Sequence, residues 1–216
     1  MTSDNDYGGW KKSKLDIFWG EIAPCDHVLQ IYENDEVFLN ALAGFVGDGI
    51  NSGDSCIIIA TDIHLEALEK KLENYGVHVR LLAADNRYIP LNAKEMLSRF
   101  MVNGWPDETL FMHTVSEILK EARSTNHRRI RAFGEMVAIL WEEDNNGATV
   151  HLEHLWNKFC QQDAFCLFCA YPKSAFTEDI NNSMDHICNA HSKMIGGSQK
   201  QLAEVFYKET QHRKAI

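Results

Sequence analysis

The sequence contains no apolar run that approaches the roughly 20 residues needed for a membrane helix. Its first 14 residues, MTSDNDYGGWKKSK, lack the apolar centre of a signal peptide. Only four of the 216 residues are proline, and 45% are hydrophobic, which argues against a disordered chain. We therefore expect a soluble α/β chain with a cytoplasmic location and no membrane partner.

Positive charge is also scarce. The net charge is -10 and the sequence pI is about 5.4, and the basic clusters at Lys11–Lys12 and residues 127–129 are short. A nucleic-acid-binding surface usually needs a longer basic stripe, so we expect no direct contact with nucleic acid. The six cysteines lie mostly in apolar strings such as SCIIIA and FCLFCAY, where reduced cysteines pack as small core residues.

Three motifs of common α/β enzymes are missing. No GxxxxGK[ST] phosphate loop follows the first expected strand, where the sequence reads YENDEVF and is acidic. Neither a GxGxxG dinucleotide fingerprint nor a GxSxG nucleophile elbow occurs. ATP hydrolysis, dinucleotide chemistry and a serine hydrolase are therefore disfavoured, and we expect no cofactor.

Apolar segments with strand composition alternate with amphipathic segments of helical period. Such alternation predicts a three-layer α/β fold, with a mainly parallel sheet of about five or more strands and helices on both faces. The expected strands are residues 27–33, 55–61, 77–82, 129–134 and 164–171. Residues 84–91 are expected to form a loop, and residues 92–95 to begin a helix with inward Met96, Leu97, Phe100 and Met101.

The chain is predicted to have three parts. Residues 1–24 form an amino-terminal arm that docks in part, with Trp10, Phe18 and Trp19 as its large aromatics. Residues 25–195 form the main domain. Residues 196–216 are expected to form a carboxy-terminal helix with Leu202, Val205 and Phe206 on one side, suited to docking or dimerisation.

Ligands of open parallel sheets bind beyond the carboxyl ends of the strands, so the residues at those ends are the candidates for a site. A buried Glu135 would need a partner such as Arg87 or His64, because an unpaired buried carboxylate is too costly to stay charged. Glu135 also directly precedes a helix, where an acid contributes roughly 0.3 to 1 kcal/mol as a terminal charge, and this reading stays open. The predicted ligand-binding residues are Tyr32, Glu33, His64, Arg87, Glu135 and Tyr171, with Trp141 or Trp105 as an apolar wall.

No metal site is expected from the sequence. Cys166 and Cys169 are three apart in a strand and should point to opposite faces. Cys188 and His191 share a helical face at spacing i, i+3, but two ligands do not make a zinc site without others from elsewhere. They remain weak candidates.

Several strings together resemble one family. They are DHVLQIYEND, FVGDGINSGDSCIIIATDIHLEALEKKLENYG, LNAKEMLSRFMVNGWPDETLF, RIRAFGEMVAILWEEDNNGATVHLEHLWNKF and FCLFCAYP. Over roughly residues 25–195 the chain resembles the MEDS domain, the methanogen and methylotroph DcmR sensory domain. The resemblance implies a sensory module of prokaryotic signal transduction and transcription regulation, and a RecA/KaiC-like core with a degenerate phosphate loop.

From this resemblance we expect a non-catalytic module that binds a small organic molecule at the carboxyl edge of the sheet. Its output would pass to a protein partner such as a histidine kinase or a regulator, and a homodimer is compatible with the amphipathic carboxy-terminal segment. Two alternatives stay open: an enzyme that uses Glu135 and His64 as acid and base, and a scaffold that binds only protein.

Overall fold

In the computed structural model, the described residues are 11–12, 19, 22–123, 128–175, 181–196 and 204–207. They contain an eight-stranded sheet. The six strands from β9 to β4 are parallel to one another, β10 pairs antiparallel with β9, and β1 pairs antiparallel with β10. Its order is β1 (Lys11–Lys12), β10 (Glu204–Tyr207), β9 (Lys193–Gly196), β2 (His27–Tyr32), β8 (Cys166–Pro172), β7 (Ile130–Gly134), β3 (Ser55–Ala60) and β4 (Tyr88–Asn92).

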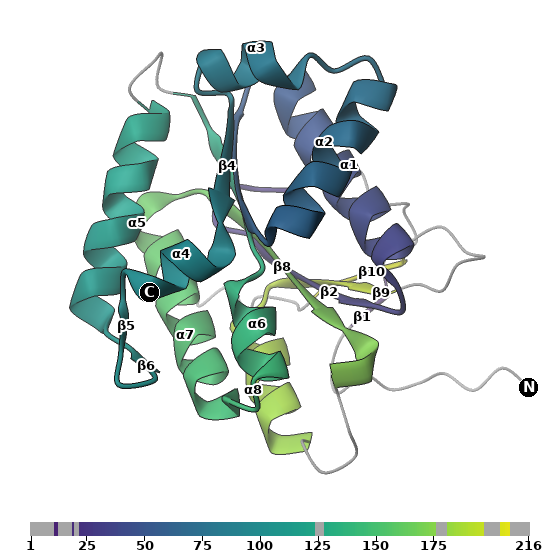
Figure 1. The fold of residues 1–216 in the computed structure, drawn as a ribbon. Coiled ribbons are helices and arrows are strands. Elements are labelled where there is room, and N and C mark those ends of the chain that lie inside the picture. The colour runs from purple at the N-terminus through teal and green to yellow at the C-terminus, as the bar shows by residue number, and fades with distance from the viewer. Residues whose placement is uncertain are drawn as a thin grey trace, which may run out of the picture.

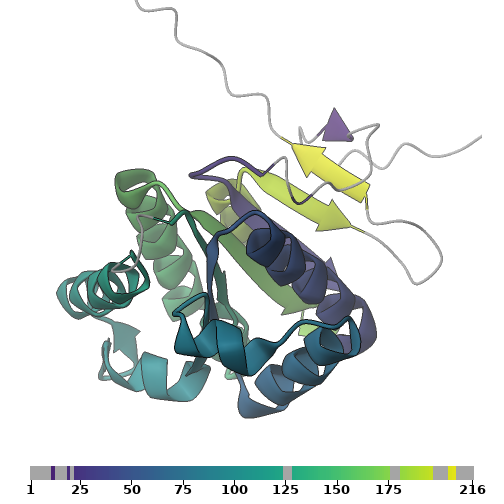
Figure 2. The same ribbon diagram turned by 90° about the horizontal axis from the view of Figure 1, so that it is seen from above.

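Helices cover both faces of this sheet (Figures 1 and 2). One layer consists of α1 (Asp35–Asn51), α2 (Asp62–Asn74) and α3 (Val79–Ala84). The other consists of α4 (Ala93–Ser98), α5 (Glu108–Arg123), α6 (Met136–Glu142), α7 (Asn146–Asp163) and α8 (Asn181–Ala190). The predicted three-layer α/β fold is confirmed. No described helix is long and apolar enough to span a membrane.

The central strand β3 shows why the sheet forms where the sequence predicts it. All six of its residues are buried, because both faces of a parallel sheet are covered by helices. Successive side chains alternate between two cores: Ile57 and Ile59 pack under α4 to α8, whereas Cys56 and Ile58 pack under α1 to α3.

The third strand lies elsewhere than predicted. The predicted strand 77–82 overlaps α3 (Val79–Ala84), and the predicted loop 84–91 contains most of β4 (Tyr88–Asn92). The following helix is also shorter than expected: Asn92 caps it by accepting from the backbone N–H groups of Lys94 and Glu95, and it ends at Ser98. The next segments form a small hairpin, β5 (Met101–Val102) with β6 (Trp105–Pro106).

The prediction of a carboxy-terminal helix is wrong for residues 204–207, the part of that segment that the structure describes. Residues Glu204–Tyr207, which include Val205 and Phe206, form β10, which pairs antiparallel with β9. The rest of that segment, Leu202 included, lies outside the described residues, as do Trp10 and Phe18. Trp19 of the arm does dock: its ring lies 5.3 Å from Phe45 and 5.4 Å from Phe168.

Candidate functional site

Glu135 links the ends of two neighbouring strands. It follows β7 directly and its backbone N–H donates to the Ile59 carbonyl of β3 at 2.9 Å. Its side chain does not cap α6, although it occupies the N-cap position. Instead, Oε2 accepts a hydrogen bond of 2.8 Å from the backbone N–H of Thr61. The carboxylate therefore fixes the carboxyl end of β3 against that of β7.

The second carboxylate oxygen contacts His64 in the first turn of α2. The distance from Glu135 Oε1 to His64 Nδ1 is 2.6 Å, and the two side chains are only 9% and 14% exposed. The hydrogen bond to Glu135 raises the pKa of His64 above its ordinary value, against the opposing effect of burial. The predicted partnership of Glu135 with His64 is confirmed as a contact. The other ring nitrogen, Nε2, lies 4.0 Å from the exposed carboxylate of Asp35.

Aromatic rings form the inner wall beside this pair. Tyr32, at the end of β2, stacks on Phe38 with ring centroids 4.9 Å apart, and Phe38 meets the His64 imidazole edge-on at 5.0 Å. Burial, and then the negative charges of Glu135, Asp35 and Glu142, raise the pKa of the Tyr32 hydroxyl above its ordinary value. The phenol therefore stays neutral beside the carboxylates.

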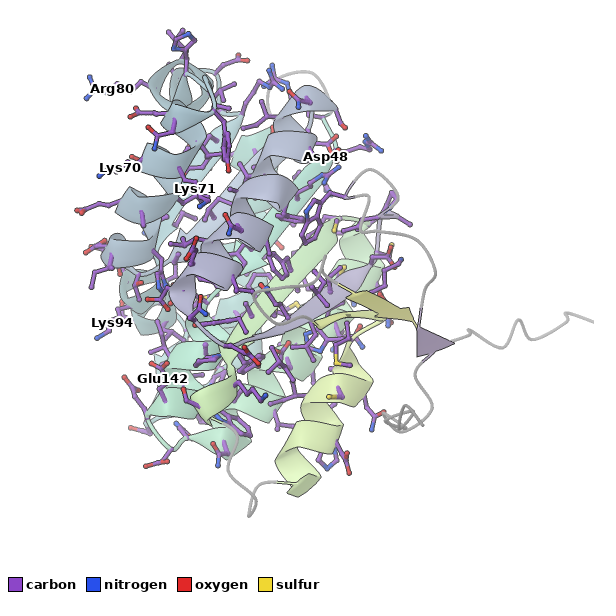
Figure 3. The ribbon with its side chains drawn as sticks, turned by 90° about the vertical axis from the view of Figure 1, so that its right-hand side faces the viewer. Asp48, Lys70, Lys71, Arg80, Lys94 and Glu142 are labelled. Carbon is purple, nitrogen blue, oxygen red and sulfur yellow. The ribbon has the colours of Figure 1, made fainter. Side chains whose placement is uncertain are left out.

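The site is acidic and has no room for a phosphate-binding loop. Only Glu33 and Asn34 connect β2 to α1, and the first turn of α1 carries Asp35 and Glu36. Burial, and then the negative charges of Glu135 and Asp35, raise the pKa of Glu142 above its ordinary value. Figure 3 shows Glu142 and Asp48 towards opposite ends of the molecule, Glu142 at the end where the parallel strands finish.

Two predicted residues do not join this group. Arg87 precedes β4 instead of following a strand, so it lies at the amino edge of the sheet, where its guanidinium donates to the Ile50 carbonyl. Its predicted place at the carboxyl edge is wrong because β4 begins at Tyr88. Glu33 is at the carboxyl edge but is exposed, 3.5 Å from the ammonium group of Lys173.

The three other aromatic candidates lie away from the Glu135–His64 pair. Trp141 and Tyr171 are buried under the opposite face of the sheet, with ring centroids 6.2 Å apart. Trp105 lies in the β5–β6 hairpin, is 48% exposed and stacks on His151 at 5.2 Å. The predicted seven-residue site is thus divided between two faces and two edges of the sheet.

One group of polar side chains was not predicted as a group. Donor atoms of His27, Glu153, Cys169 and His191, all buried, lie within 4.8 Å of one another. They come from β2, α7, β8 and the residue after α8, so no local spacing connects them. The predicted split of the strand cysteines holds, since Cys169 and Cys166 belong to the cores on opposite faces. Cys188 is half-buried on α8 and is not part of the group.

A surface hollow of about 440 Å³ also lies between α2 and α3. It is lined by Glu73 and residues 76–81, at the opposite end of α2 from His64.

Comparison with known proteins supports the fold. A KaiC-like protein from the hyperthermophilic archaeon Pyrococcus horikoshii OT3 superposes with a TM-score of 0.56 at 10% sequence identity, covering 89% of this chain and 84% of that one. A second protein of Pyrococcus horikoshii OT3 gives a TM-score of 0.51 at 10% identity, covering 90% and 92%. No curated protein matches.

These likenesses show a KaiC-like, RecA-type fold. Family comparison goes further, because residues 26–192 match the family described as the MEthanogen/methylotroph, DcmR Sensory domain. The match covers most of the chain, in agreement with the resemblance carried by its sequence strings. The chain therefore belongs to the MEDS family of sensory domains.

Proposed function

We propose that this MEDS domain binds a small organic molecule at the carboxyl edge of its sheet, beside the Glu135–His64 pair. Binding changes a protein contact and passes the signal to a partner such as a histidine kinase or a transcription regulator. The observation that supports the proposal is the 2.6 Å contact between Glu135 and His64, next to the stacked Tyr32 and Phe38. Nearly buried charged pairs with perturbed pKa values cluster at functional sites, and ligands of parallel sheets bind at the carboxyl ends of the strands, where this pair lies.

The chemistry of the site selects the class of ligand. Three carboxylates, those of Glu135, Asp35 and Glu142, surround the single imidazole of His64, so a phosphate or carboxylate ligand would be repelled. An uncharged or cationic molecule that donates hydrogen bonds, such as a small alcohol or amine, matches this charge. The short β2–α1 connection agrees with a phosphate loop that has degenerated, because it offers no cradle of backbone N–H groups.

Native mass spectrometry of the protein purified from its natural host tests the proposal. We expect a retained molecule of low mass, and a rise in melting temperature when small alcohols or amines are added to stripped protein. The Glu135→Gln variant should lose both effects, whereas Glu143→Gln, at an exposed position beyond α6, should keep them. A wild-type protein with no retained molecule and no thermal shift across alcohols, amines, organic acids and ATP would exclude a small-molecule sensor.

The same contact favours one second candidate, an enzyme with Glu135 and His64 as base and acid. The two groups lie within hydrogen-bonding reach of each other and can approach a common substrate atom. Turnover separates the two proposals: an enzyme converts the retained molecule and loses that conversion in His64→Gln, whereas a sensor releases the molecule unchanged.

A further inference from the structure

A second polar site is buried under the other face of the sheet. We name it the buried tetrad: His27, Glu153, Cys169 and His191. Its members are exposed by only 1%, 1%, 0% and 3%, respectively. Polar groups with so little access to water must satisfy one another or bind an ion, because an uncompensated buried charge is very costly.

The separations inside the tetrad match those of a tetrahedral metal site. His27 Nε2 lies 3.3 Å from Cys169 Sγ and 3.3 Å from Glu153 Oε2. His191 Nε2 lies 3.6 Å from the same Glu153 oxygen. With zinc bonds of about 2.0–2.1 Å to nitrogen and about 2.3 Å to sulfur, the ligand atoms of a tetrahedron are about 3.3–3.6 Å apart. All four donor atoms lie within 4.8 Å of one another, so small side-chain movements complete the geometry.

Backbone contacts orient both imidazoles for binding. His27 Nδ1 is 3.2 Å from the Ala190 carbonyl oxygen, and His191 Nδ1 is 2.6 Å from the Ile187 carbonyl oxygen. A carbonyl oxygen only accepts, so each Nδ1 carries the proton and each Nε2 presents its lone pair to the tetrad. Histidines that bind metals usually have their second nitrogen held in this way.

Glu153 is oriented in a similar manner. The Tyr171 hydroxyl donates to Oε1 of Glu153, which leaves Oε2 directed at the two imidazoles. Among the described residues, this Oε2 accepts no hydrogen bond of ordinary geometry. Two imidazole lone pairs, a carboxylate oxygen and a sulfur atom thus face one another in a dry volume.

The two imidazole rings also lie side by side. The ring centroids of His27 and His191 are 3.9 Å apart, and both rings reach the same oxygen of Glu153.

We propose that the buried tetrad binds one divalent transition-metal ion, with one ligand atom from each of its four side chains, and that zinc fits it best. Nitrogen, sulfur and carboxylate oxygen are the donors that zinc accepts, and four protein ligands without solvent access are typical of a closed structural site. Binding displaces the proton of the Cys169 thiol, and that of Glu153 where it is protonated, and these protons pass to solvent.

The ion would connect the carboxy-terminal part of the domain to its centre. Cys169 and His27 lie on two adjacent central strands, whereas His191 lies in the connection that leads from α8 into β9. Metal binding would therefore stabilise the edge of the sheet formed by β9 and β10. This proposal is independent of the ligand site at the carboxyl edge, which lies on the α1–α2 side of the sheet.

Cobalt(II) titration of the full-length protein, stripped with a chelator, tests the inference. Cobalt bound to a thiolate gives a near-ultraviolet charge-transfer band, and tetrahedral cobalt gives strong visible absorption. We expect both signals to saturate at about one equivalent and to be displaced by zinc. The metal content of the purified protein should approach one ion per chain, and its removal should lower the melting temperature.

Two variants and one matched control identify the ligands. Cys169→Ala should abolish the charge-transfer band, and Glu153→Gln should weaken cobalt binding at least about 10-fold. Cys166→Ala changes a buried cysteine of the same strand on the opposite face, and it should retain the band at wild-type strength. Wild-type protein without a thiolate band at saturating cobalt would overturn the proposal and show that the tetrad only shares protons. A band that persists in folded Cys169→Ala would overturn it as well.

Discussion

Replacement of Glu135 by Gln removes one charge and keeps the size of the side chain. The amide oxygen can still accept from the backbone N–H of Thr61, so the link between β3 and β7 is preserved in part. The charge-assisted bond to His64 is lost, and such bonds contribute about 1.5 to 3 kcal/mol. Because the side chain of His64 is only 14% exposed, solvent screens this pair little. We expect the free energy of unfolding to fall by about 1.5 to 3 kcal/mol.

The loss should depend on pH with a definite sign. Glu135 raises the pKa of His64 in the folded protein above the value of 6.5 expected when unfolded. The folded state then binds the proton more tightly, so the stabilisation is complete below pH 6.5 and is lost as the pH rises through the folded pKa. The difference between wild type and variant should be largest near about pH 6 and smaller near about pH 9.

Urea unfolding at both pH values measures the stability, and NMR titration of the His64 ring measures its pKa. Glu143→Gln removes an exposed carboxylate nearby and should change neither quantity. If Glu135→Gln destabilises the protein equally at both pH values, or leaves the pKa of His64 unchanged, the contact is not the ion pair described above.

Three further predictions concern stability and are all measured by urea unfolding with far-ultraviolet circular dichroism. Tyr171→Phe removes the donor to Glu153 Oε1 in a dry core and should cost about 1 to 3 kcal/mol; an unchanged midpoint would show that this oxygen has another donor. Arg131→Met leaves Asp54 and Asp48 without their buried guanidinium and should cost about 3 to 5 kcal/mol. Arg129→Met removes a side chain that is 61% exposed from the same Asp54 and should cost about 0 to 1 kcal/mol, so equal losses would contradict this assignment. Gly49→Ala places a Cβ 2.8 Å from both Arg131 Cδ and Cys56 Sγ and should destabilise by about 1 to 3 kcal/mol, whereas Gly47→Ala in the same helix meets nothing within 4 Å and should stabilise by about 0.5 to 1 kcal/mol.

Local patterns predicted the central part of the sheet. The run of apolar residues in β3, the alternation of strands with helices, and the strand-to-helix junction at Glu135 all appear as expected. These predictions are correct for two reasons. A strand covered on both faces must be apolar throughout, and a residue that directly follows a strand lies at the carboxyl edge whichever strands pair with it. The partnership with His64 followed from the cost of burying an unpaired carboxylate.

The edges of the sheet were harder to predict. The segment VHVRLL alternates like a strand, yet Val79–Ala84 is helical, and the actual strand β4 contains Pro90. A proline lacks the N–H that a central strand needs. Among the described residues, however, β4 pairs only with β3 and is therefore an edge strand, where proline is tolerated. Because β4 begins at Tyr88, Arg87 precedes the strand and lies at the amino edge of the sheet, whereas the misplaced strand had put it at the carboxyl edge.

The buried tetrad shows the limit of reasoning from spacing. The i, i+3 rule selected His191 but paired it with Cys188, because it assumed that one helix continues through both. In the structure α8 ends at Ala190, and the turn that follows directs His191 inward, towards residues 164 and 38 positions away along the chain, His27 and Glu153. Only the strand order, in which β2 lies between β9 and β8, brings these residues together. Metal ligands that come from separate elements are therefore found by combining a predicted strand order with the buried polar residues of each strand, since adjacency in the sheet replaces adjacency in sequence.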